Sequence, residues 1–279
     1  MTVTRYFKDI DYDSELGYPN QFNWTEFKLV LKVYMNRIQP PGDKTVKTSD
    51  GDKVKIQPWT DAEWKTFKDD VKADAEKYLN RPYNRLGLFP HSKPQNKFSK
   101  IQYLYFLHKN PQKELPAFVF CGVEIRIVFE QTDAHVRFQV YRQKDGGPDF
   151  RSFDEPKPGK DYGELTNRDV DRGATRPADG LPQNGVTHEL GHVLGLDHSN
   201  INDPKCVNGN ERICYGKPGT PEYSNWMGNG NAVTTANAAP WLTRIGKHAD
   251  GLDWSAMTVD PHLLLDLWKR DPPRIKMRF

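Results

Sequence analysis

Long apolar runs and targeting features are scarce in this chain of 279 residues. The most apolar stretch, Leu115 to Val123, contains a proline and is far too short to span a bilayer, so the sequence predicts no transmembrane segment. Met1 to Ile10 shows no apolar core and no small-residue cleavage site, so we expect no conventional secretory signal there. The three cysteines are few, and their odd number gives a mixed redox signal.

An excess of charge of one sign is also missing. The formal net charge of +3 is too small to argue for nucleic acid, and no basic cluster is interleaved with aromatic residues. Hydrophobic residues make up only 36%, which indicates a polar surface and long loops. A chain of this length can still bury a substantial core, so we expect one large domain or two subdomains.

The segment from Thr187 to Ser199 reads T-H-E-L-G-H-V-L-G-L-D-H-S and contains the pattern H-E-x-x-H-x-x-G-x-x-H. On a helix, His188 and His192 present their rings on one face and can bind one metal ion. Gly195 can adopt a positive φ, end the helix and turn the chain so that His198 becomes the third ligand. Three histidines leave a fourth position for water, which is typical of catalytic zinc sites. The sequence therefore predicts zinc bound by these three histidines.

Glu189 directly follows the first ligand in this pattern. It is too close to His188 to serve comfortably as a ligand, but it is well placed to accept a proton from a water molecule, so we predict that it is the catalytic base. One alternative is a buried helix whose histidines bond to the backbone. Others are a zinc-stabilised binding or structural module without catalysis, and a zinc hydrolase acting on a non-peptide amide. A structural site has no use for this carboxylate, which favours catalysis.

The motif resembles that of the metzincin clan of zinc endopeptidases, and the serine after the third histidine is most similar to the matrixin branch. The resemblance covers roughly residues 184–230. It implies a methionine-containing turn beneath the zinc site, called the Met-turn below, and Met227 in Y-S-N-W-M-G-N-G is the candidate. Some members carry a tyrosine two residues after this methionine. Here that position is Asn229, so no such tyrosine is inferred.

The resemblance also implies an α+β fold with a twisted mixed β-sheet, two long helices, a zinc-binding active-site helix, the Met-turn and a C-terminal helix. We expect an N-terminal subdomain over residues 1–195 and a C-terminal subdomain over residues 196–279. Hydrophobic periodicity, capping and turn signals predict the individual elements. These are strands at 27–35 and 101–107, a helix at 60–79 opened by Thr60 and Glu63, a hairpin of 122–131 with 135–143, extended loops without a clear strand at 144–181, the zinc helix at about 182–194, and a terminal helix at about 260–270.

Cys206 and Cys214 flank a turn-rich loop between the third histidine and the Met-turn, and we expect them to form a disulfide. The alternative is two free thiols in a surface loop. Cys121 lies in an apolar strand and is predicted to be a buried structural thiol. The remaining histidines are scattered and are expected to be surface or capping groups. A weaker alternative metal site is a calcium loop formed by the oxygen side chains of Asn167, Asp169 and Asp171.

These features together predict a zinc-dependent endopeptidase acting on protein or peptide substrates. An extended peptide is expected to add to a sheet edge, with the 135–143 strand as the candidate. Val193 and the segment 228–241 are expected to wall a side-chain pocket. The missing leader motivates a narrower hypothesis, a bacterial effector or toxin protease delivered to a target cell by a signal-independent route, with delivery machinery and an immunity or inhibitor protein as partners. The alternative is a conventionally secreted enzyme without its leader.

Overall fold

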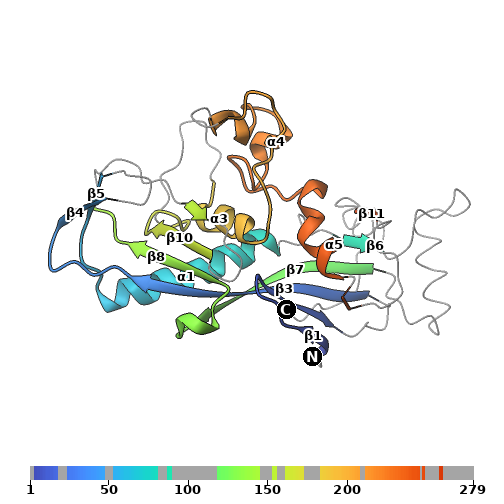
Figure 1. Cartoon of the computed structure of the whole chain (residues 1–279), viewed down its shortest axis with the longest axis horizontal. Helices are drawn as coiled ribbons and strands as arrows, with labels where there is room; N and C mark the ends of the chain where they lie inside the picture. The colour runs from blue at the N-terminus through green and yellow to red at the C-terminus, as the bar shows by residue number, and fades with distance from the viewer. Residues whose placement is uncertain are drawn as a thin grey trace, which may run out of the picture.

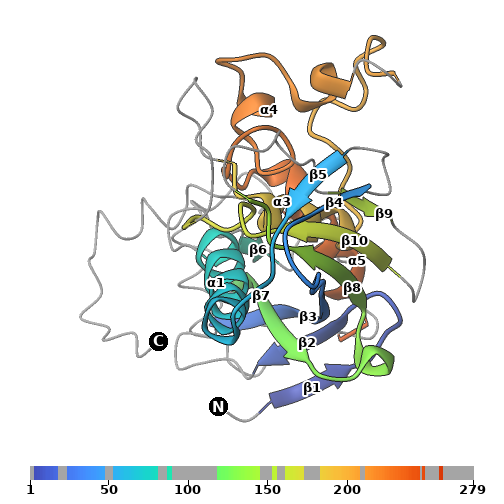
Figure 2. The same cartoon turned by 90° about the vertical axis from the view of Figure 1, so that its left-hand side faces the viewer.

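The computed structural model describes residues 3–17, 24–47, 53–80, 87–89, 118–144, 153–155, 161–172, 183–207, 211–245, 247–248 and 258–259. These residues form a mixed β-sheet with helices packed against it (Figures 1 and 2). The predicted α+β class is confirmed at this level, with a twisted mixed sheet and few helices.

The longest strand, β3 (Trp24–Arg37), lies in the middle of the sheet, and its β-branched and aromatic residues suit such a position. β7 (Phe118–Val128) pairs in parallel with β3 from Trp24 to Tyr34. β8 (Val136–Tyr141) pairs in parallel with the last residues of β3 on the other side. β10 (Asp161–Thr166) lies parallel to β8, and β9 (Phe153–Glu155) lies antiparallel to β10 at the end of this side.

Shorter strands and the helices complete the described structure. β2 (Asp13–Gly17) pairs antiparallel with β3 and with β1 (Val3–Phe7), while β6 (Gly87–Phe89) and β11 (Thr258–Val259) extend the sheet beyond β7. A separate pair consists of β4 (Lys44–Lys47) and β5 (Lys53–Ile56). The helical elements are α1 (Asp61–Leu79), η1 (Gln131–Asp133), α3 (Gly185–Val193), η2 (Glu211–Tyr215), α4 (Pro221–Ser224), η3 (Thr235–Ala238) and α5 (Ala239–Ile245).

The strand order contradicts the predicted hairpin of residues 122–131 with 135–143. Two alternating segments around a short turn favour a hairpin, but β3 lies between β7 and β8 and runs parallel to both. The short link through η1 therefore crosses from one side of β3 to the other, because the 14-residue β3 offers each segment a parallel partner. β8 is consequently an interior strand, and the predicted substrate-binding edge at 135–143 is wrong.

The predicted absence of a strand in residues 144–181 is also wrong, because β9 and β10 lie there. Gly163 and Glu164 interrupt the apolar pattern of β10, which hides the strand in the sequence. The Glu164 carboxylate is buried and accepts a hydrogen bond from the Tyr141 hydroxyl on β8 at 3.0 Å. Such a bond lets a polar side chain lie inside a sheet. The predicted strand at 101–107 and helix at 260–270 lie outside the described residues.

The helix α1 has the predicted position and N-cap. The Thr60 hydroxyl accepts from the Glu63 backbone N–H, and the Glu63 carboxylate accepts from the Thr60 backbone N–H. Further along the helix, side chains bond to main-chain groups of β7 and so cover its open edge. These bonds join Lys72 and Glu76 to Ile125, and Asn80 to Val123.

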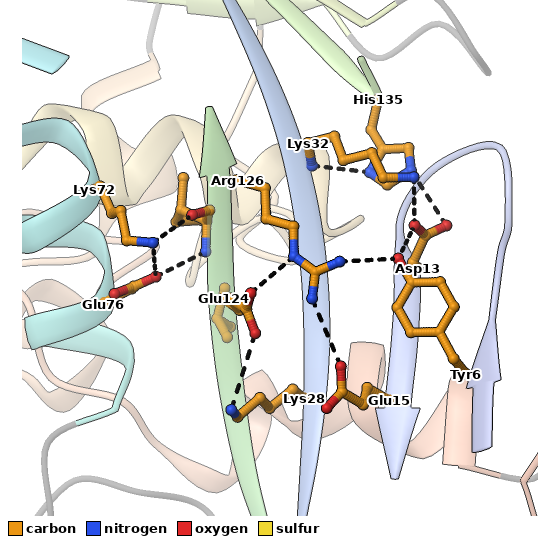
Figure 3. A network of polar contacts seen from close by, with 12 residues as sticks. Tyr6, Asp13, Glu15, Lys28, Lys32, Lys72, Glu76, Glu124, Arg126 and His135 are labelled. Atoms are coloured by element: carbon orange, nitrogen blue, oxygen red, sulfur yellow. Dashed lines mark hydrogen bonds and ion pairs between the residues drawn. The ribbon is translucent and has the colours of Figure 1, made fainter. Parts of the chain in front are cut away.

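The two faces of β3 have different surroundings because side chains alternate along a strand. One face, from Phe27 to Met35, is buried in the same hydrophobic core as residues of α1 and α3. The other face carries Lys28 and Lys32, which pair with acidic side chains of β2 and β7 (Figure 3). Both helices therefore pack on the apolar side of the sheet. None of the described helices combines the length and apolarity needed to cross a membrane.

Candidate metal centre

The metal motif begins on α3, whose first helical residue is Gly185 rather than Pro182. Asn184 caps this helix in an extended conformation, and its side-chain oxygen accepts from the Thr187 backbone N–H. A capping residue lies outside helical geometry, so α3 begins after Asn184, later than the predicted start at about residue 182. The Asn184 amide also donates to Asp74 on α1 and to Asp171. One buried side chain therefore fixes the start of α3 against α1.

The three predicted ligands converge. The ring nitrogens available from His188, His192 and His198 all lie within 4.8 Å of one another. Nε2 of His192 and Nε2 of His198 are 3.2 Å apart. The rings of His188 and His192 are almost perpendicular, at 88°. Histidine, cysteine and acidic side chains are the usual metal ligands. Among the described residues, these three histidines form the group that lies close enough together to hold a metal ion.

Hydrogen bonds at Nδ1 orient two of these rings. Nδ1 of His188 lies 3.0 Å from the Trp226 carbonyl oxygen, and Nδ1 of His192 lies 2.8 Å from the Leu196 carbonyl oxygen. A carbonyl oxygen only accepts, so each Nδ1 carries the proton and donates it. The Gln183 side-chain nitrogen, which donates to the Gly228 carbonyl, also lies 2.9 Å from Nδ1 of His188. In the tautomer in which Nδ1 donates to the two carbonyls, the lone pair of each neutral ring is at Nε2, as metal ligation requires.

The spacing of one pair of these nitrogens fits a small transition-metal ion. Zinc–nitrogen bonds of about 2.0–2.1 Å at tetrahedral angles place two ligands about 3.3 Å apart. The 3.2 Å between Nε2 of His192 and Nε2 of His198 agrees with this value. Neutral imidazoles bind zinc and neighbouring divalent metals well. The residues present therefore fit the predicted metal.

Gly191 lies between the first two ligands and allows α3 to approach Met227. A Cβ atom at this position would overlap Sδ of Met227 and lie 2.7 Å from Nε1 of Trp226. Trp226 Nε1 also donates to the Thr187 carbonyl at 2.7 Å, which ties the turn to the helix. Met227 is completely buried. The structure thus brings Met227 directly against the helical turn that carries His188 and His192.

The third ligand follows a sharp change in chain direction. Gly195 has a φ of 85°, and the helix ends at Val193, as the motif predicts. After His198, the Ser199 backbone N–H donates to the Met227 carbonyl at 2.9 Å. The segment that carries the third ligand is therefore attached to the same turn that packs under the helix.

Glu189 is buried, with 6% of its surface exposed, and lies beside His188 on α3. Carboxylates are rarely buried without compensating groups, because desolvation of the charge is costly. A cation held by the adjacent imidazoles would lower this cost further. The position is therefore compatible with the predicted role of Glu189 as a base.

One aromatic residue of the site was not predicted from the motif. The ring of Tyr215 lies 4.3 Å from the His198 ring and 5.5 Å from the His188 ring, measured between centroids. Tyr215 follows Cys214, which forms a disulfide with Cys206. The sequence feature that could have pointed to Tyr215 is its position directly after the bridged cysteine, between the third ligand and the Met-turn. Cys121 is buried in β7 and forms no disulfide.

Part of the predicted pocket wall lines a cavity of about 330 Å³ beside the second ligand. Val193 contributes from α3, and Ala239 and Pro240 contribute from the segment after the Met-turn. The sequence did not predict the contribution of Asp11 and Tyr12, which come from the loop between β1 and β2.

Arg244 on α5 holds this N-terminal loop in place. It is paired with Asp9 and Asp11, and its guanidinium carbon lies 4.3 Å from the centroid of the Tyr12 ring. Lys247 also pairs with Asp9. Hydrogen bonds from Lys247 and Arg244 lower the pKa of Asp9 to about 2, against the opposing effect of burial, so this anion persists at neutral pH. The Arg244–Asp11 pair, which joins α5 to the loop between β1 and β2, thus lines one side of the cavity.

The alternative calcium residues make separate contacts within the fold. Asn167 accepts from the Gln143 backbone N–H, Asp169 accepts from the Thr166 backbone N–H, and Asp171 pairs with Lys77. Hydrogen bonds from Lys77, Asn184 and Tyr78 outweigh the opposing effect of burial and lower the pKa of Asp171. These contacts give the three side chains roles in anchoring loops and α3.

The remaining histidines differ from the prediction where they are described. His135 and His248 are buried rather than exposed. Nδ1 of His135 accepts from the Lys32 backbone N–H, and His248 bonds to the Ser14 hydroxyl. Both anchor β2 or β3, which explains their burial. His91, His108 and His262 lie outside the described residues.

Comparison with known proteins adds no relative. No protein-family model, no curated protein and no solved structure matches this chain. The function is therefore argued from the metal centre itself.

Proposed function

We propose that this protein is a zinc-dependent endopeptidase of the metzincin type. The observation that carries the proposal is the convergence of three imidazoles next to a buried glutamate on the same helix. Zinc, when bound by these imidazoles, polarises a carbonyl group and makes a water molecule more acidic. The metal-binding residues are His188, His192 and His198.

Glu189 acts as the general base and then as the general acid. Its carboxylate accepts a proton from the water molecule that attacks the scissile carbonyl, and it passes this proton to the departing amine. His188 and His192 keep their orientation through the bonds to the Trp226 and Leu196 carbonyls. Preorganised ligands and a fixed base reduce the rearrangement needed during reaction.

An extended peptide is proposed to bind along β9. This strand pairs with β10 on one side and lies against α3, and the described residues place no second strand beside it. Edge strands accept peptides by continuing the main-chain hydrogen bonds of the sheet. The cavity beside His192 then accommodates one substrate side chain.

The Cys206–Cys214 disulfide supports a place of action outside the reducing cytosol, because such bridges persist mainly in oxidising environments. This is compatible with secretion or with delivery to a target cell as an effector or toxin protease. Protein substrates are the proposed partners, with an immunity or inhibitor protein and delivery machinery in the effector case.

Elemental analysis and digestion of a peptide library test the proposal on the same preparations. The wild-type protein is expected to contain one zinc ion per chain and to cleave peptides. Glu189→Gln keeps the side-chain shape but cannot accept the proton, so zinc is retained while hydrolysis falls by about 10²- to 10⁴-fold. Alanine at each histidine is expected to remove both zinc and activity.

Each alternative function gives a different result in this experiment. A zinc-stabilised binding module contains zinc but cleaves no peptide, and Glu189→Gln leaves its properties unchanged. A hydrolase of non-peptide amides cleaves small amides and leaves the peptide library intact. Near-normal peptide turnover in Glu189→Gln would remove this residue from the mechanism.

A further inference from the structure

Tyr215 contacts two of the three metal-binding histidines through its aromatic ring. Its centroid is 4.3 Å from that of His198, with 45° between the planes, and 5.5 Å from that of His188, with 32° between the planes. The His188 and His198 rings are themselves 5.4 Å apart and nearly parallel. Contacts at these distances are typical of packed aromatic rings. One side chain from η2, outside α3, therefore packs on the first and third ligands.

His198 receives this contact on a segment outside α3. His188 and His192 belong to α3, and the Trp226 and Leu196 carbonyls orient their rings. His198 instead follows the glycine turn on a non-helical segment. A ring on such a segment has more rotational freedom unless neighbours restrict it. The ring of Tyr215 is placed to restrict it.

The backbone around Tyr215 is attached to the segment that carries His198. The Asn200 backbone N–H donates to the Cys214 carbonyl at 2.9 Å, and its side-chain amide donates to the Ile213 carbonyl at 2.8 Å. The disulfide joins Cys214 to Cys206. Asn200 thus holds the two main-chain positions before Tyr215. The second of them, Cys214, also closes a loop through the disulfide.

We propose that Tyr215 is a positioning residue of the metal centre and that the Cys206–Cys214 bridge holds it against His188 and His198. This inference deepens the proposed function and rests on it. Groups that orient metal ligands are commonly worth about 10- to 100-fold in metal affinity. The affinity of the centre therefore depends on an intact ring at position 215 and on the oxidised state of the loop.

The test measures zinc affinity by chelator competition, the visible spectrum of the cobalt-substituted protein, and the melting temperature. Tyr215→Phe keeps the ring and is expected to bind zinc within about threefold of wild type. Tyr215→Leu removes the ring and is expected to weaken zinc binding by about 10- to 100-fold and to alter the cobalt spectrum. Tyr34→Leu is the matched control, because Tyr34 is also half-buried but belongs to the other face of β3. This control should leave zinc affinity unchanged.

The bridge is tested with Cys206→Ser/Cys214→Ser and with wild type treated with a phosphine reductant. Both are expected to bind zinc more weakly than the untreated wild type, as Tyr215→Leu does. The reductant should have no further effect on the serine variant. If Tyr215→Leu does not fold, Tyr215→Met replaces it, since methionine fills the space without an aromatic ring.

Wild-type zinc affinity and an unchanged cobalt spectrum in folded Tyr215→Leu or Tyr215→Met would overturn the positioning role. Unchanged affinity after loss of the bridge would overturn the role of the disulfide. The peptide digest separates the two proposals: metal binding that depends on Tyr215 in a protein without peptidase activity rejects the proposed function alone. A wild-type protein without metal rejects both.

Discussion

At the scale of single residues, Gly191 shows how closely the metal helix packs on the turn below it. Any side chain at this position would overlap Met227. Because interiors are close-packed, the two residues depend on each other. Met227 is completely buried and provides hydrophobic contacts rather than a metal ligand in the proposed centre.

Met227→Ala is therefore expected to reduce the free energy of unfolding by about 2–5 kcal/mol, through the cavity that it opens. Met227→Leu conserves volume and should cost less than about 1.5 kcal/mol. Both variants should retain zinc to a large extent, since all three ligands remain. Urea unfolding and elemental analysis check these outcomes. A fully stable Met227→Ala variant would contradict the proposed packing of Met227 beneath the metal site.

His135 predicts a dependence of stability on pH. Burial lowers its pKa below the ordinary 6.5, the Lys32 charge adds to this effect, and Asp13 opposes it. The Lys32 backbone N–H donates to Nδ1, so the neutral ring is the form that fits (Figure 3). The unfolded chain binds this proton more readily than the folded chain. The His135 contribution is therefore complete above pH 6.5 and is lost as the pH falls towards the folded-state pKa.

The free energy of unfolding should consequently decrease by up to about 1.4 kcal/mol per pH unit on account of this group. His135→Gln can accept from Lys32 and donate to Asp13 without titrating, so it should remove this part of the slope. Denaturant unfolding of both proteins between pH 5 and pH 8 provides the comparison. Parallel slopes for the two proteins would show that His135 does not titrate in this way.

The convergence of the three histidines could be predicted from the sequence because helical geometry alone places His188 and His192 on one face, and a glycine turn explains His198. Tyr215 could not be predicted in the same way. Its contact with His198 depends on how a disulfide-closed loop returns to the chain after the third ligand. The number of residues between His198 and Tyr215 does not show that the chain folds back in this way.

At the scale of elements, local signals were reliable where one segment decides the structure. The capping box at Thr60 predicts the start of α1, since both partners lie within one helical turn. Strand pairing depends on distant partners instead. Alternation predicts β7 and β8 as strands, but it cannot show that β3 lies between them. β10 was missed because its buried Glu164 is stabilised by Tyr141 from a neighbouring strand.

The two N-caps give a matched prediction. Thr60→Ala and Asn184→Ala each remove a cap and should each cost about 0.5–2 kcal/mol of stability. Only Asn184 also bonds to Asp74 and Asp171 and fixes the start of the metal helix. Zinc affinity should therefore fall for Asn184→Ala and stay unchanged for Thr60→Ala. Equal zinc affinity in the two variants would show that the cap of α3 does not influence the site.

At the scale of the whole molecule, the site is built from segments that are far apart in the sequence. The loop between β1 and β2 contributes Asp11 and Tyr12 to the cavity beside His192, and α5 contributes Thr243 and Arg244. Arg244 and Lys247 bind Asp9 and so join the two ends of the described chain. No local motif contains this arrangement, which is why the sequence predicted only part of the cavity wall.

The position of Thr243 allows the cavity to be tested as a specificity pocket. This side chain is exposed and lines the cavity without belonging to the metal-binding set. Thr243→Trp should fill much of the volume of about 330 Å³ and reduce kcat/KM for peptides with large side chains at one position. Cleavage of peptides with small side chains there should change much less, because small side chains do not occupy the volume that the tryptophan fills. The loss for large side chains should correspond to about 1–3 kcal/mol, the usual worth of such a pocket contact.

Thr45→Trp on β4 provides the control, since Thr45 is also exposed but does not line the cavity. Peptide-library profiles of the two variants and of wild type give the comparison, with zinc content measured alongside. A uniform loss of activity for all peptides in Thr243→Trp would indicate disturbance of the metal centre instead. An unchanged profile would show that substrate side chains bind elsewhere, and the contacts of Asp11, Tyr12 and Arg244 would then serve to hold the N-terminal strands on the sheet.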